Sequence, residues 1–230
     1  MFNAKKLKKE VESQEYKGFI VEKDPKSMAS EAYRSLRTDI QYSSFNNELK
    51  TMLVTSSEAS DGKSTISGNL ALSFAENDKK VIIIDCDLRR PSIHRKFKIS
   101  NLVGLSEILI GKTSLEETIQ KYNDNLDILP SGNIPPNPAE MLSSHAMTTL
   151  LEILKEKYNI VILDSPPIQA VADAQILSAK VDGTILVVKS EKTKKESIIE
   201  AKNLLTKVGA NIIGTVLNAV EYTRGKYYYD

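Results

Sequence analysis

The chain has few of the residues that build disulfide scaffolds, metal clusters or membrane spans. Its 230 residues include one cysteine, Cys86, two histidines and no tryptophan. A single cysteine cannot form an internal disulfide or build a thiolate zinc site by itself, which suits a reducing compartment. No apolar run approaches the roughly 18 to 20 residues that a spanning helix needs, and the N-terminus lacks a signal peptide's apolar core. We therefore expect a soluble, cytoplasmic protein.

Neither sign of charge dominates the composition. The chain has 31 Lys and Arg against 30 Asp and Glu, so no overall field attracts nucleic acid or an anionic membrane, and we expect no nucleic-acid partner. Only the first ten residues lean basic, which predicts a solvated leader, with a weak membrane or partner contact as the alternative. The expected organisation is an N-terminal extension over 1–26, one domain over 27–220 and a flexible tyrosine-rich tail over 221–230.

Short runs rich in Val, Ile and Leu recur along the chain and are typical of buried parallel strands. Their apolar character is continuous, as a sheet covered on both faces requires. The runs lie at 52–55, 81–84, 126–129, 160–163, 184–188 and 212–217. Segments with helical spacing lie between them, for example from Met147 to Leu154. This alternation predicts an α/β fold, a doubly wound and mainly parallel sheet with helices on both faces.

A glycine-containing loop lies between the first apolar run and a segment with helical spacing. It ends with the sequence Ser60-Asp61-Gly62-Lys63-Ser64-Thr65. Backbone N–H groups and the dipole at such a helix start bind anionic phosphates. Lys63 would reach the β- and γ-phosphates of a nucleotide, and the Ser64 hydroxyl would bind Mg²⁺. The usual pattern has glycine where this chain has Ser57, so an ordinary strand-to-helix turn is the alternative.

Two of the expected strands end in acidic residues. Asp85 and Asp87 follow one of them, and Asp164 follows another. Ligands bind outside the carboxyl ends of strands in a doubly wound sheet, so these carboxylates should face the phosphate loop. Mg²⁺ prefers carboxylate, hydroxyl, water and phosphate oxygens, and Ser64, Asp85 and Asp164 are suited to hold it directly or through water. Because phosphoryl transfer needs mainly positioning and charge neutralisation, the set predicts a phosphoryl-transfer site.

Charged residues near the N-terminus recur at helical spacing. Glu31, Arg34 and Arg37 are three positions apart in a segment from Ser30 to Phe45 that has the apolar spacing of a helix. One interpretation is pairing of Glu31 with Arg34 on a solvated helix face. The other is a subunit interface, because arginine forks bind carboxylates of a neighbouring chain well.

Four of the nine tyrosines lie in the last nine residues, at Tyr222, Tyr227, Tyr228 and Tyr229. Their polar neighbours and a glycine leave no buried stripe, so the tail should be mobile. The residues after Val220 span about 34 Å when extended, enough to reach a neighbouring subunit's site. Beside a phosphoryl-transfer site such a tail is a candidate substrate, and a sticky aromatic tail without catalytic meaning is the alternative.

Four motifs together make the chain resemble the bacterial protein-tyrosine kinases of capsule and exopolysaccharide synthesis. The resemblance is to the split form, whose catalytic domain is separate from its membrane activator, and it covers nearly the whole chain. The matching segments are 62–65 for Walker A, 82–89 for Walker A′, 162–167 for Walker B and 31–37 for the subunit-interface motif. The resemblance implies a fold of the P-loop NTPase type, with the kinase domain over 27–220.

The resemblance also implies roles for individual residues. Lys63, Asp85 and Asp87 would be catalytic, with Asp87 orienting or deprotonating the attacking tyrosine. Ser64, Asp85 and Asp164 would serve Mg²⁺, and Arg89 would contact a phosphate or support the residues that do. The residues expected to bind ATP are Ser60, Asp61, Gly62, Lys63, Ser64, Thr65 and Asn218.

The implied activity is an ATP- and Mg²⁺-dependent kinase that phosphorylates its own tail tyrosines in trans within a homo-oligomeric ring, and other protein tyrosines. The cytoplasmic segment of a membrane polysaccharide co-polymerase would activate it and hold it at the inner face of the membrane. The alternative is an ATPase switch of the ParA/MinD-like class that positions plasmids and septa. That class has a signature lysine where this chain has Glu58. A third hypothesis is a non-catalytic nucleotide-binding adaptor.

Overall fold

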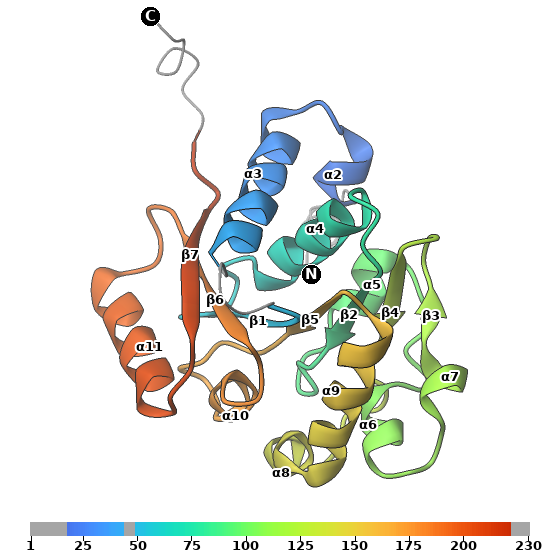
Figure 1. Cartoon of the computed structure of the whole chain (residues 1–230). Helices are drawn as coiled ribbons and strands as arrows, with labels where there is room; N and C mark the ends of the chain where they lie inside the picture. Colours follow the sequence, from blue (N-terminus) through green and yellow to red (C-terminus); the bar gives the residue numbers. More distant parts are fainter. Residues whose placement is uncertain (1–17, 44–48, 222–230) are drawn as a thin grey trace, which may run out of the picture.

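A seven-stranded sheet lies between two layers of helices in the computed structural model, which describes residues 18–43 and 49–221 (Figure 1). The strands are β1 (Thr51–Ser56), β2 (Val81–Asp85), β3 (Gln120–Lys121), β4 (Leu126–Leu129), β5 (Ile160–Asp164), β6 (Gly183–Lys189) and β7 (Ile212–Asn218). The helices are α2 (Ile20–Lys23), α3 (Met28–Tyr42), α4 (Lys63–Ala75), α5 (Ile93–Phe97), α6 (Leu105–Leu109), α7 (Leu115–Thr118), α8 (Pro138–Ser143), α9 (His145–Lys157), α10 (Asp173–Ser178) and α11 (Lys195–Lys207).

The strands follow the order β3-β4-β2-β5-β1-β6-β7. Every neighbouring pair is parallel except β3 with β4. The carboxyl ends of β1, β2 and β5 therefore meet at one edge of the sheet, and Asp85 lies in register with Asp164. The predicted doubly wound, mainly parallel α/β fold is confirmed, and each of the six expected strands is present within one or two residues.

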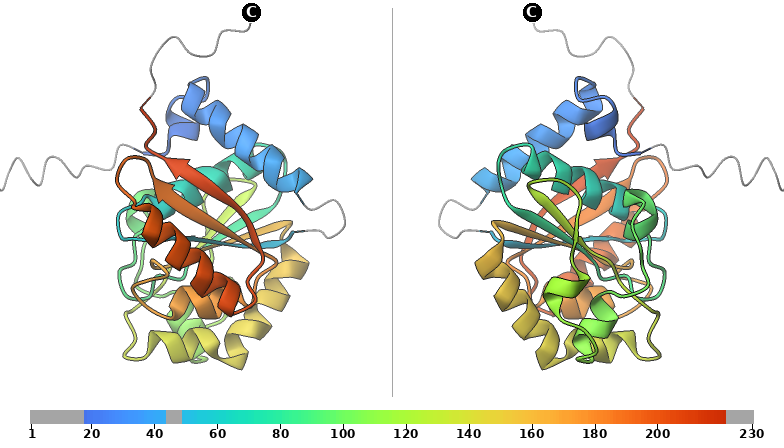
Figure 2. Two further views of the ribbon diagram at one scale, coloured as in Figure 1. Left: turned by 90° about the vertical axis from the view of Figure 1, so that its left-hand side faces the viewer. Right: turned by 90° about the vertical axis from the view of Figure 1, so that its right-hand side faces the viewer.

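Two apolar cores cover the two faces of the sheet. Successive residues of a strand point to opposite faces, so Leu53 joins one core while Met52 and Val54 join the other. The side views show α3 and α4 on one face and α8 and α9 on the other (Figure 2). Burial on both faces explains why the strands are continuously apolar.

The described part of the expected N-terminal extension packs onto the domain. Phe19 and Val21 are each 1% exposed, and Val21 N–H donates to Asn69 Oδ1 on α4 at 3.1 Å. The Phe19 ring lies 4.4 Å from the Phe97 ring, measured between centroids. The packed domain therefore starts before residue 27. Among the described residues, no helix is long and apolar enough to cross a membrane.

Side-chain caps mark the starts of two of the long helices. The Ser27 hydroxyl accepts from Ser30 N–H at the start of α3, and the Ser144 hydroxyl accepts from Met147 N–H at the start of α9. Helix α3 ends at Tyr42, three residues before the expected end at Phe45, and residues 44–48 lie outside the described part. Strand β3 has two residues, too few to produce a periodic pattern.

Candidate active site

The phosphate loop connects the carboxyl end of β1 to the start of α4. Two of its residues have left-handed backbone conformations, Ser60 with φ 68° and Gly62 with φ 102°. Glycine is required at position 62, because a Cβ there would lie 2.0 Å from Asn218 Nδ2 and because a side chain disfavours that φ. The turn directs the first N–H groups of α4, which begins at Lys63, toward the carboxyl edge of the sheet.

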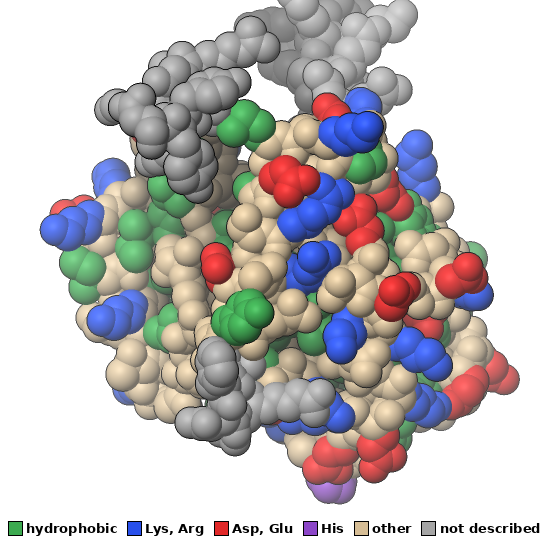
Figure 3. Space-filling view, turned by 45° about the horizontal axis from the view of Figure 1, so that its top comes forward, with side chains coloured by type: hydrophobic (Ala, Val, Ile, Leu, Met, Phe, Trp, Pro, Cys, Tyr) green, Lys and Arg blue, Asp and Glu red, His purple; other side chains and the backbone are tan. Residues whose placement is uncertain are grey.

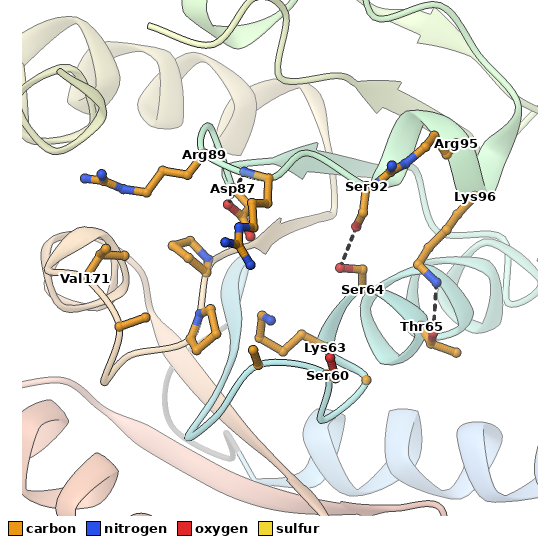
Figure 4. Close-up of a pocket in the computed structure, with 16 residues that line it drawn as sticks. Ser60, Lys63, Ser64, Thr65, Asp87, Arg89, Ser92, Arg95, Lys96 and Val171 are labelled. Carbon is orange, nitrogen blue, oxygen red and sulfur yellow. Dashed lines mark hydrogen bonds between the residues drawn. The ribbon is translucent and has the colours of Figure 1, made fainter. Parts of the chain in front are cut away.

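A pocket of about 780 Å³ opens beside this loop (Figure 4). Its walls are the loop with the first turn of α4, the segment after β2 with α5, and the segment after β5. The residues that line it are Ala59, Ser60, Gly62, Lys63, Ser64, Thr65, Asp87, Arg89, Arg90, Ser92, Arg95, Lys96, Pro166, Pro167, Ala170 and Val171. The pocket therefore joins three of the segments that the sequence singles out.

Two fully buried carboxylates lie behind the pocket on neighbouring strands. Asp85 Oδ2 accepts from the backbone N–H groups of Ser92 and Ile93, both at 2.9 Å. Asp164 Oδ1 accepts from Ser67 Oγ at 2.9 Å. Asp164 Oδ2 is buried without a hydrogen-bond partner at normal distance, although the Ser64 hydroxyl is near enough to lower the pKa of this carboxyl.

Burial makes this pair difficult to ionise. Desolvation raises the pKa of Asp164 to about 6, against the pull of the Lys63 ammonium, which lowers it. Desolvation and, next, the charge of Asp164 raise the pKa of Asp85 well above its usual range. Two like charges this close favour a bound cation. Asp164 Oδ2, which has no hydrogen-bond partner, is suited to be one of its ligands.

The donor set fits Mg²⁺ better than a metal held by protein alone. No group of three or more His, Cys, Asp or Glu residues in the described ranges is arranged to hold a metal ion. Mg²⁺ usually takes one or two carboxylates together with water and phosphate oxygens. Asp164, Asp85 and the hydroxyl of Ser64 are such a partial set, which bound phosphates would complete.

Helix α5 and the residue before it provide a polar wall that the sequence pattern does not predict. Ser92 Oγ donates to Ser64 Oγ at 2.8 Å, and Lys96 Nζ donates to Thr65 Oγ1 at 3.0 Å. Desolvation lowers the pKa of Lys96. The only sequence signal for these two residues is their place shortly after Asp85 and Asp87, because α5 has five residues and no clear periodicity.

Asp87 and Arg89 diverge from the end of β2. Asp87 lines the pocket, and its Oδ1 accepts from Arg90 N–H at 2.9 Å. Arg89 donates two hydrogen bonds to the buried carboxylate of Asp173, at 2.8 and 3.0 Å, which raises the pKa of the guanidinium. Its side chain extends away from Ser64 in Figure 4. This placement favours a supporting role for Arg89 over a direct phosphate contact.

Two expected ATP-binding residues have side chains engaged with the loop itself. Asp61 is 1% exposed, and its carboxylate accepts from Thr193 Oγ1 and Glu58 N–H, both at 3.0 Å. Asn218 Nδ2 donates to the Asp61 carbonyl at 2.8 Å. Neither lines the pocket, whereas Ser60 does.

Comparisons with known proteins identify the family of this chain. A family described as an AAA domain matches residues 49–213. The tyrosine-protein kinase YwqD of Bacillus subtilis is 43% identical over 223 residues, 96% of this chain and 94% of that protein. The chain belongs to the bacterial tyrosine-protein kinases.

Two further matches span most of the kinase. The putative tyrosine-protein kinase CapB of Staphylococcus aureus is 38% identical over 206 residues, 89% of this chain and 90% of that protein. The crystal structure of the chimerical protein CapA2B2 is 36% identical with a TM-score of 0.86, covering 91% of this chain and 92% of that one. We therefore reject the ATPase-switch and adaptor hypotheses in favour of the kinase hypothesis.

The charged residues of α3 in this kinase, Glu31, Arg34 and Arg37, are here called the α3 triplet. Arg34 Nη1 bonds to Glu31 Oε1 at 2.6 Å, so the intrahelical pair predicted as one alternative is present. Arg37 Nη1 donates to the Ser73 carbonyl on α4 at 2.5 Å. Both signs of charge are interspersed over the face that carries α3 (Figure 3). The interface role stays a prediction, and the tail tyrosines lie outside the described residues.

Proposed function

We propose that this kinase transfers the γ-phosphoryl group of ATP, with Mg²⁺, to tyrosines of its own C-terminal tail in trans. The observation that carries the proposal is the buried pair Asp85 and Asp164 beside Lys63 and Ser64, with Asp87 at the pocket wall. An anionic pair placed at a phosphate loop is unfavourable unless a cation joins it. Phosphoryl transfer uses such a cation.

Each residue of the pocket has a task in this reaction. Lys63 and the N-terminus of α4 hold the β- and γ-phosphates. Ser64, Asp85 and Asp164 would hold Mg²⁺, which neutralises phosphate charge when bound. The tyrosine oxygen attacks the γ-phosphorus, the bond to the β–γ bridging oxygen breaks, and Asp87 accepts the phenol proton. A carboxylate is needed there because free tyrosine has a pKa near 10.

The segment after β5 offers a surface for the acceptor ring. Pro166, Pro167, Ala170 and Val171 line that wall of the pocket. The wall is fixed to the end of β1, because Thr55 Oγ1 donates to the Pro166 carbonyl at 2.9 Å. A tyrosine ring packs its apolar face on such a wall and leaves its hydroxyl free to reach Asp87.

The same proposal extends to assembly and regulation. The α3 triplet would contact a neighbouring copy in a ring, so that Tyr222, Tyr227, Tyr228 and Tyr229 of one chain enter the pocket of the next. Each phosphate adds about 1.5 to 2 negative charges beside acidic residues, which repels the modified tail and loosens the ring. We place the kinase at the inner face of the membrane, activated by the cytoplasmic segment of a polysaccharide co-polymerase, in the control of capsular or exopolysaccharide synthesis and export.

A labelling assay tests the activity. The protein is mixed with Mg²⁺, γ-labelled ATP and the activator's cytoplasmic segment, and compared with Lys63→Ala and with the variant whose four tail tyrosines are phenylalanine. Label should enter tyrosine in the wild type, disappear in Lys63→Ala and largely disappear without tail tyrosines. Lys112→Ala, at an exposed lysine, is the matched control and should label normally. Free phosphate with unlabelled protein would refute the proposal and favour an ATPase.

A mixing experiment tests transfer between chains. Lys63→Ala keeps an intact tail but no activity, and the variant without tail tyrosines keeps activity but no acceptor. Mixed together, they should label the tail of the Lys63→Ala chain. No label in that chain, while the wild type alone is labelled, would refute transfer in trans.

A further inference from the structure

The phosphate loop is held on its outer side by the segment between β6 and α11. Ser197 Oγ, in the first turn of α11, donates to Glu58 Oε1 at 2.7 Å. Thr193 Oγ1 donates to Asp61 Oδ1 at 3.0 Å and accepts from Lys189 N–H at 3.0 Å. The two acidic side chains of the loop thus point away from the pocket and into this segment.

Glu58 stands where the ATPase-switch class has its signature lysine, and it accepts a hydrogen bond from its own chain. The Glu58 N–H donates to Asp61 Oδ2 at 3.0 Å, so the two loop anchors are also linked to each other. Both anchors of the loop are thus contacts within one chain.

The end of β7, just before the tail, belongs to the same network. Asn218, the last residue of β7, donates to the Asp61 carbonyl and touches Gly62. Its own carbonyl accepts from Ser190 N–H at 2.8 Å. Asp61 is therefore held at its carboxylate and at its carbonyl, one residue before the glycine that starts the phosphate-binding turn.

The loop needs such support because its backbone is strained. Five non-glycine residues of the described ranges have left-handed φ values; Ser60 is one of them and lies in the loop, and Glu191 and Ala219 lie beside the residues that hold it. Non-glycine residues avoid this region, and surrounding contacts must hold them there. Without the anchors, the loop would relax and its N–H groups would no longer converge on the phosphates.

We propose that Thr193 is a positioning residue for the nucleotide phosphates. It acts through Asp61, does not line the pocket, and fixes the conformation in which the phosphate loop binds. This inference rests on the proposed ATP-dependent function, and it predicts that nucleotide affinity depends on a hydroxyl at position 193. Ser197 and Glu58 form a second, more exposed anchor of the same loop.

Binding of MgADP to the full chain, measured by titration calorimetry, tests the proposal. Thr193→Val keeps the side-chain shape, removes the donor to Asp61 and the acceptor for Lys189 N–H, and should weaken binding about tenfold. Thr193→Ser restores both hydrogen bonds and should restore affinity. Thr206→Val is the matched control, because that hydroxyl bonds only within α11, and it should bind like the wild type.

Two further measurements separate positioning from a general loss of structure. In assays run well below the melting temperature of the variant, the KM for ATP should rise in Thr193→Val and return to the wild-type value in Thr193→Ser, which a merely structural role would not produce. Asp61→Ala removes the acceptor of the Thr193 hydroxyl, so Thr193→Val added to Asp61→Ala should weaken binding no further than Asp61→Ala alone. Independent, additive losses would overturn the proposal.

The outcomes distinguish this inference from the kinase proposal. If wild type binds MgADP and Thr193→Val binds equally well, the positioning role is refuted and the kinase proposal stands. If Thr193→Val unfolds, the affinity of Thr193→Ser for MgADP is the test. Wild-type affinity of Thr193→Ser supports the positioning role. Weakened affinity of a folded Thr193→Ser overturns it. Wild type that binds no nucleotide would refute both.

Discussion

Replacing Asp164 by asparagine should stabilise the nucleotide-free protein at neutral pH and abolish kinase activity. Asp164 is fully buried, and its pKa rises from 3.8 to about 6 on folding. Each pKa unit is worth about 1.4 kcal/mol, so keeping this carboxylate ionised costs about 3 kcal/mol of folding free energy. An amide of the same shape avoids that cost and still accepts from Ser67.

The sign of the pH dependence follows from the raised pKa. The folded state keeps the proton up to about pH 6, whereas the unfolded state releases it near 3.8. This carboxyl therefore destabilises progressively as pH rises through that window, and its full cost is present above it. The stability difference between Asp164→Asn and wild type should be about 3 kcal/mol at pH 7.5 and about 1 kcal/mol at pH 4.5.

Urea unfolding followed by circular dichroism, with EDTA present, measures this difference at both pH values. The melting temperature at pH 7.5 should rise by about 6 to 12 °C. Asp124→Asn is the control, because that side chain is 97% exposed and its replacement should change stability little. MgADP should stabilise wild type more than Asp164→Asn. Equal or lower stability of Asp164→Asn at pH 7.5, or a difference independent of pH, would refute the reasoning.

Three other predictions follow from the packing. Alanine at the whole α3 triplet should shift the assembly toward monomer, and an unchanged sedimentation coefficient would contradict the interface role. Phe19→Ala should lower the free energy of unfolding in urea by about 3 to 5 kcal/mol, because it leaves a cavity in the core. Leu102→Ala is the control and should lower it little, because the Leu102 side chain is 80% exposed. Gly62→Ala should abolish MgADP binding in calorimetry, whereas Gly214→Ala, where a Cβ meets nothing within 4 Å, should leave it intact.

Most strands and long helices can be predicted from the sequence, because the patterns that indicate them are local. A buried strand such as Val81–Asp85 is apolar throughout, and a helix such as α9 repeats its apolar residues every three or four positions. The short helices α5 to α8 and the strand β3 lack enough residues to show a period. Residues 19–21 carry too little pattern to reveal that Phe19 is buried, so the sequence alone predicts an extension there.

The candidate site was partly predictable for the same reason. Asp85 and Asp164 each follow a strand, and parallel strands bring their carboxyl ends together, so their approach could be inferred without coordinates. Side-chain direction could not be inferred. Asp61 stands within the loop sequence, yet its carboxylate turns into the protein because Thr193 offers it a donor.

The parallel sheet, the phosphate loop and the acidic strand ends can be inferred from local sequence, because each depends on residues that are neighbours in the chain. The contacts that hold the loop cannot. Asp61 and Thr193 are 132 positions apart, and Asp61 and Asn218 are 157 apart. Such contacts depend on β1, β6 and β7 being adjacent in the sheet, and strand order comes from packing of the whole chain rather than from any local pattern.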